Sequence, residues 1–162
     1  MKIFRDVDKV IGAVLDFVSS ACLVLLLIII GFMVLNRFVG LASLGWTDEI
    51  VELLFAWMIF IGAAAVWRKR SHFLVDALLK SIASPAKRNT LECLVGSLNL
   101  LFLAVLAYLS LRMTMDASEA SPVFQISKAY WYGVMPIMFL LMCVYCVRDI
   151  FIALQNFNKE GK

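Results

Sequence analysis

The chain has 162 residues, 63% of them hydrophobic, and its formal net charge is +3. A soluble globular domain contains about 45–50% apolar residues, so this composition, with a mean hydropathy of +0.91, excludes an ordinary soluble domain. The basic residues are grouped in a way that indicates membrane topology rather than nucleic-acid binding.

Four apolar segments are each long enough to cross a bilayer as a helix. They cover about residues 12–35, 49–67, 91–111 and 131–148. A transmembrane helix needs about 20 mostly apolar residues, and a helix satisfies its own backbone hydrogen bonds in lipid. We therefore predict an all-α integral membrane protein in which four transmembrane helices form a single membrane domain over residues 1–162.

The Lys and Arg residues predict the orientation. Twelve of the 15 lie before the first segment, between the second and third, or after the fourth, and three lie in the other two connections. Cytoplasmic connections are enriched in basic residues, so we expect both termini to be cytoplasmic. The first apolar run is full span length and lacks a nearby small-x-small cleavage site, so we expect it to stay as a helix.

Asp16 lies immediately before the long apolar run of residues 17–35. A carboxylate inside a membrane can couple transport to protons, but this one is so near the span end that we expect it to reach interfacial water.

Acidic residues cluster at the start of the second segment. Asp48, Glu49 and Glu52 fall within about one helical turn, where like charges repel each other unless they are paired or solvated. Arg37 is the cation nearest to them in sequence. Our hypothesis is that Arg37 pairs with Asp48 or Glu49 and locks the first two spans together. The alternative is a row of solvated charges at the water line.

Tryptophans mark both ends of the second span. Trp46 and Trp67 are 21 residues apart, about one hydrocarbon thickness on a helix, and are typical of interfacial aromatic belts. Trp57 and Gly62 lie between them and suit helix packing.

The connection between the second and third spans predicts a short amphipathic helix over about 72–83 in the membrane interface. Ser84 and Pro85 then predict an N-cap and first turn, so the third helix should begin at Pro85. His72 lies in this connection without a second His or a Cys nearby, which favours a structural hydrogen bond over a metal-binding role.

Cys143 and Cys146 form a C-x-x-C pair, but both fall inside an apolar helix in its cytoplasmic half. We interpret these two and the other two cysteines as packing residues.

An ordered set of residues resembles one transporter family. The set is Asn36-Arg37, Trp46-x-Asp48-Glu49, Trp57, Gly62, Arg68, His72, Asp76, Ser121-Pro122 and Pro136. Together these residues resemble the small membrane subunit, the DctQ-type component, of tripartite ATP-independent periplasmic (TRAP) transporters.

The resemblance implies a non-catalytic scaffold subunit in a bacterial inner membrane. It would brace a large elevator-type transport subunit and help to dock a periplasmic substrate-binding protein. The system would take up an organic acid such as sialic acid or a dicarboxylate by sodium symport. Sodium would bind the large subunit, and this chain would hold no cofactor and no metal.

The positions of these residues and the resemblance together suggest roles for particular residues, and the His72–Asp76 pair is implied by the resemblance. A polar corner at the subunit interface would contain Arg37, Trp46, Asp48, Glu49, Glu52, Trp57 and Gly62, with Glu52 and Trp57 facing the large subunit. A cytoplasmic motif would contain Arg68 and a His72–Asp76 pair. The charged residues of the last outer connection that could touch the binding protein are Asp116, Glu119 and Lys128.

Two other functions have to be weighed. A stand-alone four-span proton-coupled transporter would need an acidic residue at mid-membrane, and Asp16 is too near its span end. A membrane thiol or quinone oxidoreductase would need cysteine pairs on the outer side, whereas Cys143 and Cys146 lie in the inner half. Co-purification of a large multispan partner would favour the scaffold function over both of these alternatives.

Overall fold

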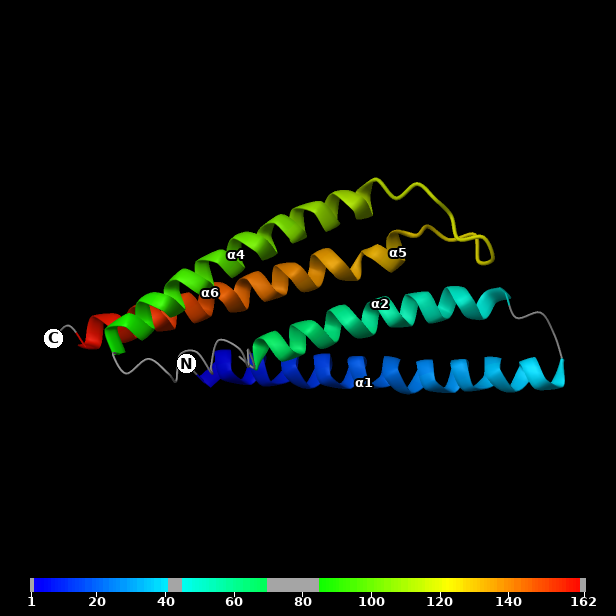
Figure 1. The fold of residues 1–162 in the computed structure, drawn as a ribbon, viewed down its shortest axis with the longest axis horizontal. Coiled ribbons are helices and arrows are strands. Elements are labelled where there is room, and N and C mark those ends of the chain that lie inside the picture. The colour runs from blue at the N-terminus through cyan, green and yellow to red at the C-terminus, as the bar shows by residue number, and fades with distance from the viewer. Residues whose placement is uncertain (1, 41–44, 70–84, 161–162) are drawn as a thin grey trace.

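The computed structural model describes residues 2–40, 45–69 and 85–160. Its helices are α1 (Lys2–Val39), α2 (Gly45–Arg68), α4 (Pro85–Met115), the single turn α5 (Ala129–Tyr132) and α6 (Val134–Glu160) (Figure 1). Within these described residues, four helical stretches are long and apolar enough to cross a membrane, and they cover Asp6–Val39, Gly45–Arg68, Thr90–Met115 and Ala129–Gln155. This confirms the prediction of an all-helical chain with four candidate spans.

The helices form a row rather than a closed square bundle. α1 packs against α2, α2 against α6, and α6 against α4, so α1 and α4 stand at opposite ends of the row (Figure 1). Only 11–22% of the most apolar part of each span is buried inside the chain. Most of the apolar surface is therefore left for lipid or for another protein.

Small side chains let the central helices approach each other closely. Ala64 on α2 has no exposed surface, and Ala65 is 5% exposed. They pack in one cluster with Leu15 of α1 and with Met142 of α6. Helices in a membrane associate through such close packing, since lipid removes the hydrophobic driving force. The α2–α6 contact is therefore the centre of the fold.

Glycine and proline set the helix ends. Gly40 follows α1 with a φ of +69°, and its N–H bonds to the carbonyl of Asn36 at 2.7 Å, which is a common way to end a helix. The fourth span is interrupted at Gly133, where α5 ends. Pro136 lies in the first turn of α6, where its missing N–H costs least. Pro85 begins α4 as expected.

The two ends of the row contain different parts of the chain. The N- and C-terminal ends of the chain lie at one end, and the connection from α4 to α5 lies at the other (Figure 1). We call these the terminal end and the loop end. The cytoplasmic location of the terminal end stays a prediction from the basic residues. The amphipathic helix expected over 72–83 lies outside the described residues.

Candidate functional site

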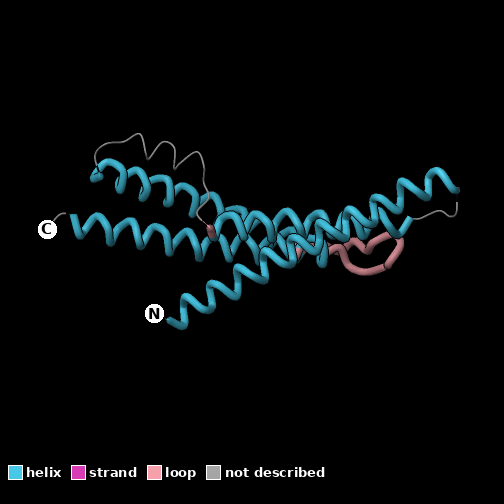
Figure 2. Tube along the Cα trace, turned by 90° about the horizontal axis from the view of Figure 1, so that it is seen from below, coloured by secondary structure: helices cyan, strands magenta, loops and turns pink. Residues whose placement is uncertain are grey.

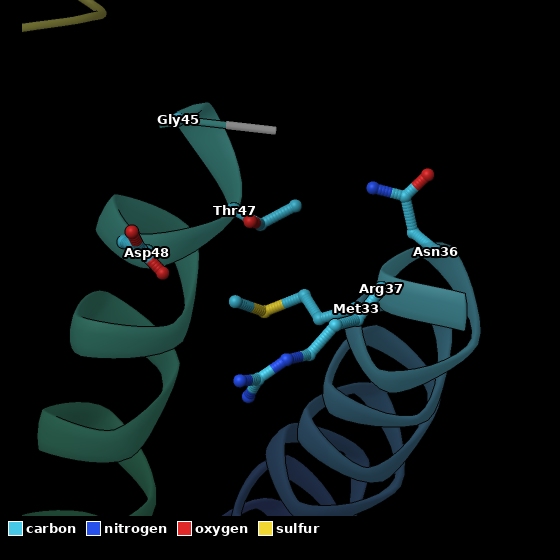
Figure 3. A pocket seen from close by; sticks show the side chains of 6 residues that line it. All are labelled: Met33, Asn36, Arg37, Gly45, Thr47 and Asp48. Carbon is cyan, nitrogen blue, oxygen red and sulfur yellow. The ribbon is translucent and has the colours of Figure 1, made fainter. Parts of the chain in front are cut away.

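At the loop end, a cavity of about 260 Å³ lies between α1 and α2. Arg37 of α1 and Asp48 of α2 both line it (Figure 3). Thr47 beside them is completely buried. The structure thus brings two of the residues of the expected polar corner to one cavity.

The expected ion pair at this corner is not formed. Among the described residues, neither Asp48 nor Glu49 lies within 4 Å of the Arg37 guanidinium. Glu49 is instead bound by the loop between α4 and α5. It accepts hydrogen bonds from the Ser121 hydroxyl, from the N–H of Val123 at 2.8 Å and from the N–H of Phe124 at 3.4 Å. Glu49 faces the loop instead of Arg37, so the hypothesised pair of Arg37 with Asp48 or Glu49 is not observed among the described residues.

Two tryptophans also link α2 to the part of the chain around α5. The indole N–H of Trp131, which is buried, donates to the carbonyl of Glu49 at 3.2 Å. The indole N–H of Trp57 donates to the carbonyl of Tyr130 at 3.3 Å. Trp57 therefore turns partly toward α5 of its own chain, although it remains 38% exposed. Together these bonds tie the first half of α2 to α5.

The loop held by Glu49 is a compact turn. Ser121 is buried, and its N–H bonds to the carbonyl of Ile126 at 2.8 Å while its carbonyl accepts from the N–H of Gln125 at 3.0 Å. Gln125 adopts a positive φ of 57°. We name residues 116–128 the outer loop. Its fold presents Val123, Phe124 and Ile126 as exposed apolar side chains.

The charged residues expected to meet a binding protein lie at the base of the outer loop. Asp116 forms a 3.6 Å ion pair with Arg112, and both side chains are about 70% exposed. The N–H of Lys128 bonds to the carbonyl of Glu119 at 3.0 Å, which brings these two residues together. Glu119 is exposed and Lys128 is half-buried. Trp46 and Glu52 are also exposed, and Gly62 packs on Ser19 of α1.

A second polar cluster joins three helices at the terminal end. Asp8 of α1 forms a 3.0 Å ion pair with Arg68 of α2. It also accepts a 3.0 Å hydrogen bond from the hydroxyl of Tyr145 of α6, and the Arg148 guanidinium lies 3.9 Å away. We name Asp8, Arg68, Tyr145 and Arg148 the inner network. Through this network, α1 contacts α6 by polar groups.

Arg68 is the only member of this network that the sequence motifs indicate. Asp8 precedes the first apolar segment and is 60 residues from Arg68 and 137 from Tyr145. The usable signal was its position, because Asp8, Arg68 and Arg148 all lie at the same end of their spans. His72 and Asp76, the other residues of the expected cytoplasmic motif, lie outside the described residues.

Asp16 has a partner on α2 and is partly exposed. Its carboxylate pairs with the ammonium of Lys69 at 2.9 Å, and both side chains are 47% exposed. Such an exposed pair contributes little to stability. The expectation that Asp16 reaches interfacial water stays a prediction.

A family model described as tripartite ATP-independent periplasmic transporters, DctQ component, matches residues 7–156. The chain belongs to this family. It is 21% identical over 161 residues to a putative TRAP transporter small permease protein of Haemophilus influenzae, covering 98% of this chain and 92% of that relative. The resemblance stated from the sequence motifs is thereby confirmed.

The chain is also 24% identical over 135 residues to the isethionate TRAP transporter permease protein DctMQ of Oleidesulfovibrio alaskensis. That match covers 77% of this chain but only 21% of the relative. The chain therefore spans about a fifth of the length of this relative.

The cysteines of this DctQ-family chain lie among packed helices. All four are free thiols, with Cys22 and Cys146 buried. The Cys146 thiol contacts the carbonyl of Gly96 on α4 at 3.2 Å, and Cys143 packs against the core cluster. These positions agree with the interpretation of Cys143 and Cys146 as packing residues.

Proposed function

We propose that this DctQ-family protein is the non-catalytic scaffold subunit of a sodium-coupled uptake system for an organic acid, such as sialic acid or a dicarboxylate. In this proposal the chain is a multi-pass protein of a bacterial inner membrane. It braces a large elevator-type subunit that binds sodium and substrate, and it helps to dock a periplasmic substrate-binding protein.

The observation that carries the scaffold role is the absence of charge in the middle of every span. Residues 17–36, 53–67, 93–111 and 129–147 contain no Asp, Glu, Lys or Arg. A transporter that binds ions or anionic substrates within the membrane places polar or ionisable groups and interrupted helices near mid-membrane. The described polar clusters of this chain lie instead at the two ends of the row.

The open row supports a large membrane partner. α1 and α4 stand at its ends with long apolar faces, and residues such as Phe17, Leu27, Leu101 and Phe102 are more than 60% exposed. The relative DctMQ, of which this chain matches about a fifth, supports the same proposal, since it joins a DctQ-like segment to a much longer permease. A rigid row could widen the fixed part of such a permease.

The outer loop supports a role at the periplasmic surface. It combines exposed apolar side chains with Asp116 and Glu119 at its base, and Glu49 holds it on α2. A fixed loop loses less entropy when a partner binds than a mobile loop does. The expected orientation places this loop outside the cytoplasm.

Co-purification tests the proposal. An affinity tag at the C-terminus of this chain, expressed in its own bacterium, should retain a large multispan membrane protein after mild detergent extraction. Mass spectrometry should identify that protein as a TRAP permease subunit. Recovery of this chain alone, under conditions in which a known membrane complex stays intact, would contradict the scaffold role.

A further inference from the structure

A groove opens between α1 and α6 at the terminal end of the row. It encloses about 480 Å³ and is lined by Val7, Asp8, Ile11, Leu141, Val144, Tyr145 and Arg148. Figure 2 shows why it exists: the N-terminal part of α1 diverges from the C-terminal part of α6 toward the ends marked N and C. The scaffold role proposed above does not use this groove.

The lining changes from polar to apolar along the groove. Asp8 and Arg148 lie at the ends of their apolar segments, where a membrane meets water. Ile11 and Leu141 lie further into the spans. One wall is α1, where Val7 is 51% exposed, and the other is α6, where Val144 is 65% exposed. The groove is therefore polar at headgroup depth and apolar at acyl-chain depth.

The polar end of the groove has hydrogen-bond donors to spare. Asp8 is neutralised by the ion pair with Arg68 and accepts a hydrogen bond from the Tyr145 hydroxyl. A guanidinium has five N–H groups. Arg148 uses one in an ion pair with Asp149 at 2.8 Å and one on the carbonyl of Arg68 at 3.4 Å, and its guanidinium carbon lies 4.8 Å from the centroid of the Tyr145 ring. Its contact with Asp8, at 3.9 Å, is beyond hydrogen-bond distance.

We propose that this groove binds one phospholipid of the leaflet at the terminal end, with the phosphate on Arg148 and an acyl chain against Ile11, Leu141 and Val144. Two features support this occupant. Arginine side chains between transmembrane helices bind lipid headgroups such as those of cardiolipin. The N–H groups of Arg148 that are not engaged by Asp149 or by the carbonyl of Arg68 match the oxygens of a phosphate. The apolar walls offer an acyl chain a surface that a free phosphate in water would not use. The inference does not rest on the proposed function.

Photo-crosslinking tests the site. A benzophenone amino acid replaces Val144 in the full chain, which is reconstituted in vesicles of equal amounts of phosphatidylethanolamine and phosphatidylglycerol. Mass spectrometry should find a phospholipid adduct at this position. Arg148→Gln should reduce it about fivefold, the effect expected when one basic residue near an anionic headgroup is lost. Arg148→Lys should retain most of it, because the charge remains.

A matched position separates the site from ordinary lipid contact. Leu94 on α4 is 58% exposed near the same end of its span, so a benzophenone there should also give lipid adducts, but Arg148→Gln should not change them. Equal adduct yields at Val144 with and without Arg148 would overturn the proposal. A polypeptide adduct at Val144 in the native membrane would overturn it too, since a partner helix would then fill the groove.

Discussion

The carboxylate of Glu49 accepts a 2.8 Å hydrogen bond from the backbone N–H of Val123, although 74 residues separate them. This bond crosses from the start of α2 to the middle of the outer loop. The hydroxyl of Ser121 and the N–H of Phe124 donate to the same carboxylate. One side chain of another element therefore holds the middle of the outer loop against α2.

Removal of the Glu49 carboxylate should loosen the outer loop. Glu49→Ala leaves the N–H groups of Val123 and Phe124 without this acceptor, so chymotrypsin should cut after Phe124 faster than in the unchanged protein. Asp48→Ala is the matched control, because Asp48 is exposed and does not bond to the loop. Equal cleavage rates for Glu49→Ala and Asp48→Ala would show that the carboxylate does not hold the loop.

Charge reversal at the base of the outer loop should weaken coupling to a binding protein. Asp116→Lys and Glu119→Lys change exposed charges, which mainly affect the rate of encounter and its salt dependence. Uptake at low concentrations of binding protein should fall, while the membrane subunits still co-purify. Lys9→Glu, an exposed reversal at the opposite end, should leave uptake unchanged. If none of the outer reversals alters uptake, this surface is not the docking site.

The inner network should show energetic coupling between α1 and α6. Asp8→Ala and Tyr145→Phe each remove one partner of a 3.0 Å hydrogen bond. A double-mutant cycle on thermal unfolding should give a coupling energy of about 0.5–2 kcal/mol. The exposed Asp16–Lys69 pair should give less than about 1 kcal/mol in the same measurement. Additive effects of Asp8→Ala and Tyr145→Phe would mean that the contact does not stabilise the protein.

Gly12 should be sensitive to substitution because of its neighbour. A Cβ at this position would overlap the guanidinium of Arg68, whereas a Cβ at Gly31 on the same helix would meet no described atom within 4 Å. Gly12→Ala should therefore displace Arg68 from Asp8 and lower the melting temperature, and Gly31→Ala should not lower it. In a protein that already carries Asp8→Asn, and therefore lacks the ion pair with Arg68, Gly12→Ala should lower the melting temperature less. If Gly12→Ala lowers the melting temperature of the Asp8→Asn protein as much as that of the unchanged protein, loss of the Arg68–Asp8 ion pair is not the cause.

The fold was predictable where long apolar runs decide it. Four spans, the start of α4 at Pro85 and the packing role of Gly62 follow from segment length and local residue chemistry. The order of the helices in the row was not predictable. Every span is apolar on most of its surface, so the sequence does not indicate which faces pack together.

The polar contacts were harder to predict because their partners are distant in sequence. Arg37 seemed a natural partner for Glu49 since a short connection joins their helices. The actual donors belong to residues 121–124, more than 70 positions further along the chain. Backbone N–H groups carry no residue-specific signal, so a sequence alone does not reveal that a loop binds a carboxylate. The inner network was not predicted either, because Asp8 is 60 residues from Arg68 and 137 residues from Tyr145 in the sequence.

Reconstituted uptake tests the central claim most directly. Three kinds of vesicle are compared: with this chain alone, with the large permease subunit alone, and with both. Sodium-driven uptake of the organic acid is measured in each, in the presence of the binding protein. A scaffold without a mid-membrane charge should give no uptake alone, and uptake should require both membrane subunits. Sodium- or proton-driven uptake by vesicles that contain only this chain would contradict the account.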